Sequence, residues 1–202
     1  MKNPYQDYTI YVGIDQSLNS TGYYVQKKHP TGSTSLVAKG TINPKNKFGG
    51  ERLKFIYGKL TKIFSMWTRN HKVLVCMEGY AYNYRSGKIF ELGEVGGIVK
   101  LLCALNSIEV IAVPPTELKK FVTGKSLASK KLMMDYTDES QDDIADAKGL
   151  SWIAQELSQR TSTERRKLEV IHNCLAKSKP SVPKPKYKRP HKSNRIAAEV
   201  LL

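Results

Sequence analysis

The chain has 202 residues, of which 40% are hydrophobic, and this is enough for one domain with a sizeable core. Its formal net charge of +15 favours a polyanionic partner, either nucleic acid or an anionic membrane surface. Three cysteines without a CxxC motif or a neighbouring histidine cluster exclude a zinc-finger or disulfide-framework protein. No apolar run approaches the roughly 20 residues that cross a bilayer, and the first residues lack a signal peptide's apolar stretch, so we expect a cytoplasmic protein.

The first 70 residues predict a three-stranded meander followed by a helix. Tyr, Ile, Val and Thr alternate or run together over residues 8–16, 21–27 and 35–42, with turn residues between them. Short turns imply antiparallel pairing of these strands. Over residues 49–70 apolar positions recur at helical spacing, which indicates an amphipathic helix.

The next part of the chain alternates strands with helices. Residues 72–78 and 108–115 are short apolar runs, typical of buried strands, and residues 86–106 between them have a helical pattern. Such alternation implies parallel pairing through crossover helices. Four more helices are predicted over residues 116–124, 126–137, 140–159 and 162–178. The predicted fold class is therefore α/β, with a mixed five-stranded sheet and helices on both faces.

A basic segment follows the last predicted helix. Residues 177–198 contain eight Lys or Arg and no acid, with many prolines and few apolar residues. Such a segment cannot bury a core and is predicted to be disordered. The predicted organisation is a folded domain over residues 1–160, an extra helix over 161–177 and a basic, disordered tail over 178–202.

Acidic side chains occur where predicted strands end and on one helix. Asp15 lies at the end of the first strand, and Glu78 ends the fourth. Asp143 and Asp146 are three residues apart and share one helix face, although Asp142 is a rival for the same face. Carboxylates brought together repel one another unless they are protonated or bind a cation. Oxygen ligands without a neighbouring histidine suit Mg²⁺, and two such ions can promote phosphodiester cleavage.

Each acid has an ordinary explanation when taken alone. An Asp after a strand usually caps a turn, and a DDxxD sequence on a helix is usually a solvated face. The order of the acids carries the functional hypothesis, because a strand Asp, a strand Glu and a late helical DxxD rarely occur together by chance.

Four segments resemble the RuvC-type Holliday junction resolvases, of the sort carried by bacteriophages, within the ribonuclease H-like superfamily. They are GIDQSLNSTGYYV, VCMEGYAYNYRSGKIFELGEVGGIVK, VPPTELKKFVTGKSLASK and DDIADAKGLS, and together they cover roughly residues 9–157. The resemblance implies a ribonuclease H-like nuclease domain over residues 1–160. It also implies that one set of acids is the catalytic, metal-binding tetrad: Asp15, Glu78, Asp143 and Asp146.

The same resemblance implies the cofactor, the substrate and the assembly. Two Mg²⁺ ions per active site are expected, with Mn²⁺ able to substitute. The expected substrate is a four-way DNA junction, cut by a homodimer through paired symmetric nicks, in the host cytoplasm if the chain is phage-encoded. The helix over residues 86–106 has an apolar stripe too wide for one sheet face, and small Gly93, Gly96 and Gly97 would let a partner helix come close.

Aromatic and basic residues near these motifs are candidate DNA contacts. Tyr80, Tyr82 and Arg85 follow Glu78, and bases stack on such side chains. In the family an aromatic shortly after this Glu is associated with wedging the junction, but the equivalent spacing falls here on Ala81. Three lysines of a second segment could contact phosphates: Lys119, Lys125 and Lys130. The alternatives are tyrosines that cover the sheet edge and an ordinary charged helix surface.

Three other functions compete with junction resolution. A nuclease of the same fold could prefer forks or flaps, and a protein of this fold could bind branched DNA without cutting it. An ATPase of the actin or sugar-kinase class also begins with a GID strand, but it needs a later DxG segment, and the sequence contains no DG or DxG. The intact set of four acids favours an enzyme over a binding protein.

Overall fold

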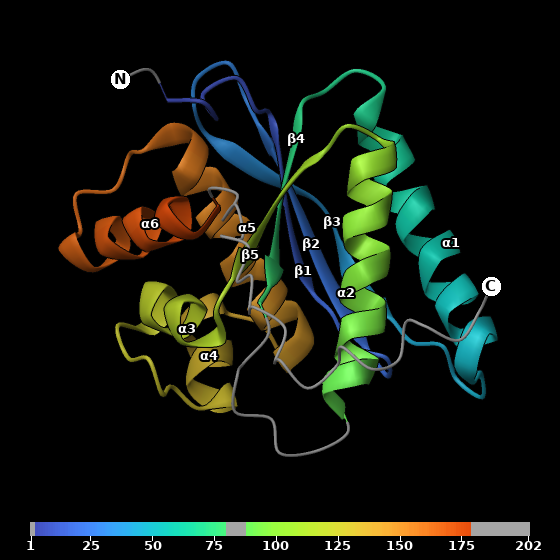
Figure 1. The fold of residues 1–202 in the computed structure, drawn as a ribbon. Coiled ribbons are helices and arrows are strands. Elements are labelled where there is room, and N and C mark those ends of the chain that lie inside the picture. Colours follow the sequence, from blue (N-terminus) through green and yellow to red (C-terminus); the bar gives the residue numbers. More distant parts are fainter. Residues whose placement is uncertain (1–2, 80–87, 179–202) are drawn as a thin grey trace, which may run out of the picture.

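A computed structural model describes residues 3–79 and 88–178 of the chain (Figure 1). The strands are β1 (Ile10–Asp15), β2 (Thr21–Lys28), β3 (Thr34–Ile42), β4 (Val73–Glu78) and β5 (Glu109–Val113). The helices are α1 (Gly49–Thr68), α2 (Lys88–Leu105), α3 (Pro115–Thr123), α4 (Lys130–Thr137), α5 (Asp142–Gln159) and α6 (Arg165–Ser178). Every predicted strand and helix is present, with ends that differ by a few residues.

The five strands form one mixed sheet in the order β3-β2-β1-β4-β5. β1 pairs with β2 and β2 with β3 in antiparallel fashion, whereas β1, β4 and β5 run parallel. In this register Ile14 lies opposite Met77, so the next residues, Asp15 and Glu78, finish neighbouring strands at the same end of the sheet. The predicted α/β class, with a mixed five-stranded sheet, is confirmed.

Helices cover both faces of the sheet (Figure 1). Ile10, Val12 and Ile14 of β1 pack in a buried cluster with residues of α1 and α2. Tyr11 of the same strand points the other way, into a cluster formed with α3, α5 and α6. Because both faces are buried, the central strands are nearly continuous runs of apolar residues.

Two glycines allow α5 to lie directly against the strands. A Cβ atom on Gly13 of β1 would stand 1.8 Å from the carbonyl oxygen of Ala147. A Cβ atom on Gly22 of β2 would stand 2.1 Å from the carbonyl oxygen of Asp143. No side chain fits at either position without moving the helix backbone, so these two glycines allow α5 to pack closely against β1 and β2.

The segment after residue 160 includes the predicted extra helix. α6 buries Val170, Ile171 and Cys174 in the same cluster that holds Leu74 of β4 and Leu157 of α5. We propose that the folded domain extends through this helix. Residues 179–202, the greater part of the predicted tail, lie outside the described residues. Within 3–79 and 88–178, the helices are each too short or too polar to cross a bilayer.

Candidate active site

Two carboxylates meet where β1 and β4 end. Asp15 is only 9% exposed, and the Glu78 carboxyl lies close enough to raise its pKa. Burial, followed by the negative charges of Glu78 and Asp146, raises the pKa of Asp15 well above its usual range.

α5 brings two more carboxylates to the same place. Asp146 and Asp143 both act electrostatically on Asp15, so the strand acids and the helix acids form one cluster. Asp143 accepts a hydrogen bond from the Ser20 hydroxyl, which belongs to the turn between β1 and β2. The four residues implied by the resemblance are thus brought together by three elements distant in sequence.

Asp142 occupies a different environment from its neighbour on α5. Its carboxylate forms an ion pair with Lys130 Nζ at the start of α4, and this contact lowers the pKa of Asp142. The charge of Asp143 acts on Asp15 and the charge of Asp142 acts on Asp146, so both carboxylates lie near the cluster. The ion pair with Lys130 distinguishes Asp142 from Asp143, and it supports Asp143 as the first helical member of the cluster.

Positive charge from α3 and α4 partly offsets the repulsion among the acids. The pKa of Glu78 is raised by burial, but the interaction with Asp15 and the charges of Lys119 and Lys130 act in the opposite direction. Burial and the charge of Glu78 raise the pKa of Asp146 to about 6, again against Lys119 and Lys130. Two lysines that the sequence indicated as DNA contacts therefore lie within electrostatic reach of the acids.

The raised pKa of Asp146 predicts a pH-dependent stability. Below the ordinary pKa of 3.8 this group is protonated in both the folded and the unfolded chain. As pH rises from 3.8 to about 6, the folded state retains its proton longer, so the free energy of unfolding should fall. Urea denaturation in EDTA should show this fall for the parent chain and a smaller one for Asp146→Asn. Parallel curves for the two proteins between those pH values would contradict the assignment.

The acids suit a hard cation in their chemistry but are not arranged around one. Within the described part of the chain, no group of three Asp, Glu, His or Cys side chains could hold a metal ion as it stands. One of the four acids, Asp143, is held by the Ser20 hydroxyl. Oxygen donors of this kind match Mg²⁺ and Mn²⁺, and a cation would relieve the repulsion that raises the pKa of Asp15.

Two residues of the stretch after β1 were not singled out in the sequence. Gln16 is 3% exposed, and its Nε2 donates a hydrogen bond to the backbone carbonyl of Glu78, which ties the ends of β1 and β4 together. Its Oε1 is buried without a hydrogen-bond partner among the described residues. Ser20 holds Asp143, as described above. The only signal was the polar sequence QSLNS directly after Asp15, which reads as an ordinary turn.

The remaining predicted DNA contacts have different outcomes. Lys125 is exposed in the loop after α3, where its backbone bonds to the Thr123 hydroxyl. Tyr80, Tyr82 and Arg85 lie outside the described residues, as does Ala81. Their predicted role stays a prediction.

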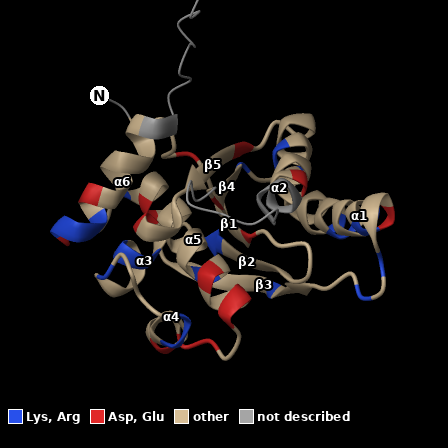
Figure 2. Cartoon of the chain, turned by 60° about the horizontal axis from the view of Figure 1, so that its bottom comes forward, with Lys and Arg blue, Asp and Glu red and all other residues tan. Residues whose placement is uncertain are grey.

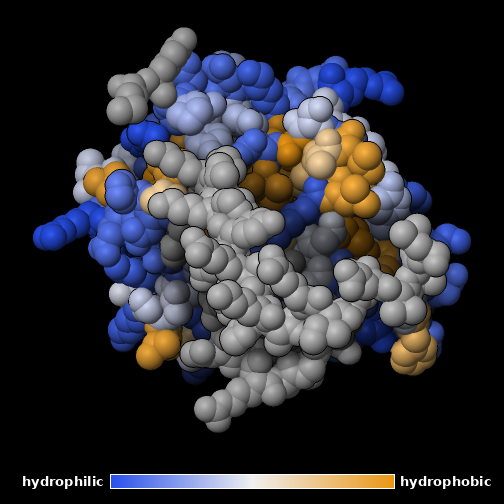
Figure 3. Space-filling model, in the orientation of Figure 1, coloured by the Kyte–Doolittle hydropathy of each residue, from blue (hydrophilic) through white to orange (hydrophobic). Residues whose placement is uncertain are grey.

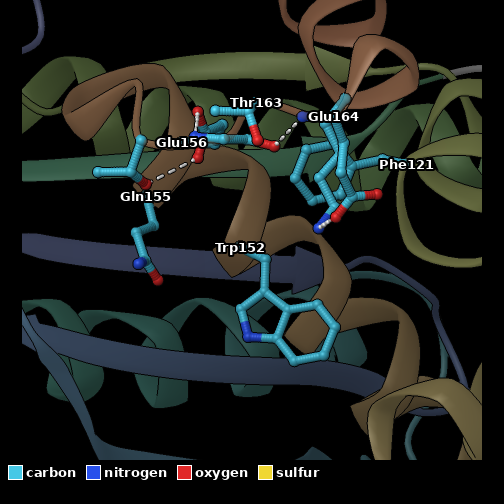
Figure 4. Close-up of a pocket in the computed structure, with 9 residues that line it drawn as sticks. Phe121, Trp152, Gln155, Glu156, Thr163 and Glu164 are labelled. Atoms are coloured by element: carbon cyan, nitrogen blue, oxygen red, sulfur yellow. Dashed lines mark hydrogen bonds and ion pairs between the residues drawn. The ribbon is translucent and has the colours of Figure 1, made fainter.

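A separate hollow of about 410 Å³ lies between α3, α5 and α6 (Figure 4). Phe121, Trp152 and Glu156 are among its lining residues. The Glu156 carboxylate accepts hydrogen bonds from Thr161 Oγ1 at 3.2 Å and from the Ser162 backbone nitrogen at 2.8 Å. The α5 residues that line the hollow begin at Trp152, almost two turns beyond Asp146, so the hollow is not part of the acidic cluster.

The family model described as Crossover junction endodeoxyribonuclease RuvC matches residues 11–151, about 70% of the chain. The chain belongs to the RuvC family. The match begins in β1, includes all four clustered acids and ends within α5. Nucleases of the RuvC family are metal-dependent.

Individual RuvC proteins agree with this assignment. RuvC of Brachyspira hyodysenteriae is 29% identical over 146 residues, which are 68% of this chain and 88% of that protein. RuvC of Pseudothermotoga lettingae is 29% identical over 152 residues, 71% of this chain and 91% of that protein. The Thermus thermophilus RuvC structure superimposes with a TM-score of 0.59 at 16% identity, covering 75% of this chain and 97% of that one. This last likeness shows the RuvC fold. The bacteriophage origin suggested by the sequence stays a prediction.

Proposed function

We propose that the chain is a Mg²⁺-dependent endonuclease that resolves four-way DNA junctions by paired symmetric nicks. The observation that carries this proposal is the convergence of Asp15, Glu78, Asp143 and Asp146 at one end of the sheet. It is supported by membership of a family described as crossover junction endodeoxyribonucleases. A Thermus thermophilus RuvC with a similar fold has been solved in complex with a Holliday junction substrate, with a TM-score of 0.57.

The four acids would hold the metal ions, two per site, and Mn²⁺ would substitute for Mg²⁺. When bound, such ions would activate water and stabilise the leaving oxygen of the scissile phosphate. Gln16 would keep the Glu78 backbone at a fixed distance from β1, and Ser20 would orient Asp143. The expected products have 5′-phosphate and 3′-hydroxyl ends.

Lysines beside the acids would bind the DNA backbone. Lys119 and Lys130 act electrostatically on Glu78 and Asp146, so they lie close to where the scissile phosphate would be. Contacts of this kind fix the position of DNA without reading its sequence. The shape of the branch would therefore decide specificity more than base edges would.

The enzyme would act as a homodimer, because a two-fold assembly matches a junction with near two-fold symmetry. Apolar residues exposed on the outer side of the paired helices α1 and α2 support this proposal. Leu101 and Leu105 of α2 are 54% and 66% exposed, and Met66 of α1 is 58% exposed. Figure 3 shows hydrophobic surface over this part of the molecule. A partner copy would cover it, and the complex would work in the cytoplasm.

Cleavage of labelled DNA tests the proposed function. In Mg²⁺ the full chain should cut a four-way junction at symmetry-related positions and leave linear duplex intact, and EDTA should abolish the cutting. A fork and a flap in the same panel decide between this proposal and a nuclease that prefers those branches. Tight binding of the junction without cutting in either Mg²⁺ or Mn²⁺ would instead indicate a protein that only binds branched DNA.

A further inference from the structure

The first four turns of α1, with Lys47 just before them, line a basic groove that the acidic site does not use. Its lining residues, here called the α1 groove, are Lys47, Glu51, Lys54, Phe55, Gly58, Lys59 and Lys62. The lining residues on the helix are adjacent or lie three or four positions apart, so they share one face of α1. They form a strip about 16 Å long. Four lysines stand against a single glutamate, so the strip is strongly positive.

The centre of the groove is an aromatic ring with cations above it. Lys47 Nζ lies 5.6 Å and Lys59 Nζ 5.5 Å from the centre of the Phe55 ring. Gly58 leaves the surface beside the ring open, because a Cβ atom there would meet nothing within 4 Å. In the part of the chain that the structure describes, the four lysines form no ion pair with an acid of the chain itself. Their charge is therefore available to an external anion.

The sheet topology places this groove at the same end of the molecule as the acids. Asp15 pairs with Gly22, and the adjacent Thr21 pairs with Ile42, so β3 ends beside the acidic cluster. α1 begins only a few residues later, at Gly49, and leads away from that end. Figure 2 looks toward this end and shows acidic segments of α5 between basic segments of α3 and α4 on one side and of α1 on the other.

From this arrangement we propose that the α1 groove binds the sugar-phosphate backbone of a second arm of the branched DNA substrate. This inference rests on the proposed function, because it assumes that a branched DNA lies over the acids. Lys119 and Lys130 would hold the arm that is cut, and the lysines of α1 would hold an arm that leaves the branch point in the other direction. A linear duplex follows one direction only, so this second contact favours branched DNA.

The dependence of binding on salt tests the proposal. Both variants are made in an Asp146→Asn background, so that the junction is bound without being cut. The test variant carries Lys54→Gln, Lys59→Gln and Lys62→Gln, three exposed residues of the groove. The matched control carries Lys27→Gln, Lys28→Gln and Lys72→Gln, which lie at the opposite end of the sheet, beside the starts of β1 and β4. Circular dichroism confirms that each variant is folded.

For each variant, the slope of log K for a four-way junction against log salt concentration is compared with that of the parent. Each lost phosphate contact should make this negative slope shallower by about 0.9. The slope should therefore become shallower by roughly 1 to 3 in the groove variant and should hardly change in the control. For a short linear duplex, the slope should change less than for the junction. Equal slopes for the groove variant and the control would overturn the proposal.

Light scattering and a cutting assay separate DNA binding by the groove from a dimer contact and from failure of the proposed function. If light scattering shows that the groove variant alone loses its dimer, the groove is a contact between copies of the chain and the proposal is wrong. Cutting by the unaltered chain in Mg²⁺ is assayed separately. Absence of cutting would contradict the proposed function, whereas the salt slopes would still decide whether the groove binds DNA.

Discussion

Replacing Asp15 by Asn should abolish cutting of a four-way junction in Mg²⁺ while leaving junction binding intact. Asp15 is the most buried of the four acids, and the other three all act on it electrostatically. Stabilisation by a bound metal ion is worth several kcal/mol, and a loss of about 4 kcal/mol corresponds to roughly a 10³-fold slower reaction. Glu78→Gln should behave in the same way. The measurements are single-turnover cutting of labelled junction and gel-shift binding of the same DNA.

Asp142→Asn is the matched control for this loss. It makes the same chemical change on the same helix, one residue before Asp143, but Asp142 is paired with Lys130 at the surface. Its effect on cutting should be less than about tenfold, because exposed ion pairs contribute little free energy. If Asp142→Asn abolished cutting and Asp15→Asn did not, the roles assigned to the acids would be wrong.

A change in stability without DNA should accompany the loss of cutting. In EDTA, Asp15→Asn removes one of several buried carboxylates that repel each other, so the variant should be at least as stable as the parent at pH 7. In Mg²⁺ the parent should gain stability through ligand binding, and the variant should gain much less. Thermal unfolding of both proteins, each with and without Mg²⁺, gives four unfolding temperatures that test this independently of any nuclease assay.

Gly13→Ala should destabilise the protein by about 3 kcal/mol, because overpacking of this kind forces backbone shifts. The added methyl group would lie 1.8 Å from the Ala147 carbonyl oxygen, and neither backbone can yield without moving α5 or β1. Since α5 carries Asp143 and Asp146, the helix shift should also reduce cutting. A displacement of about 1 Å in a catalytic group can cost about 10²-fold in rate. Urea denaturation and junction cutting measure the two effects.

Gly58→Ala is the control for this second prediction. Gly58 lies within α1 with open space where its Cβ would be, so alanine should stabilise the helix by about 0.5–1 kcal/mol. Equal stability of Gly13→Ala and the parent chain would mean that the close approach of α5 to β1 does not exist in solution.

The strands, the helices and the acids could be predicted because they leave local patterns. Apolar runs that end in Asp15 and Glu78 indicate buried strands, and parallel pairing then brings the two acids to one end of the sheet. The DxxD spacing on a helix likewise places Asp143 and Asp146 on one face. Each of these inferences uses only neighbours in sequence and one rule of sheet topology.

The contacts that distinguish similar residues could not be predicted in this way. Asp142 and Asp143 are adjacent, and only the tertiary position of Lys130 and Ser20 separates their environments. The importance of Gly13 depends on a helix that begins about 130 residues later in the chain. The lysines of α1 have the spacing of a solvated face of an amphipathic helix, and the position of the start of α1 at the acidic end of the sheet depends on how β3 pairs.

The most direct test of the central claim is to locate metal ions in crystals of the full chain grown with Mn²⁺, using the anomalous scattering of the metal. We predict a peak within about 2.0–2.6 Å of an Asp15 carboxylate oxygen. At least one further oxygen ligand should come from Glu78, Asp143 or Asp146. Mn²⁺ bound only elsewhere, in a protein that cuts junctions under the same conditions, would contradict the claim that these four acids form the active site.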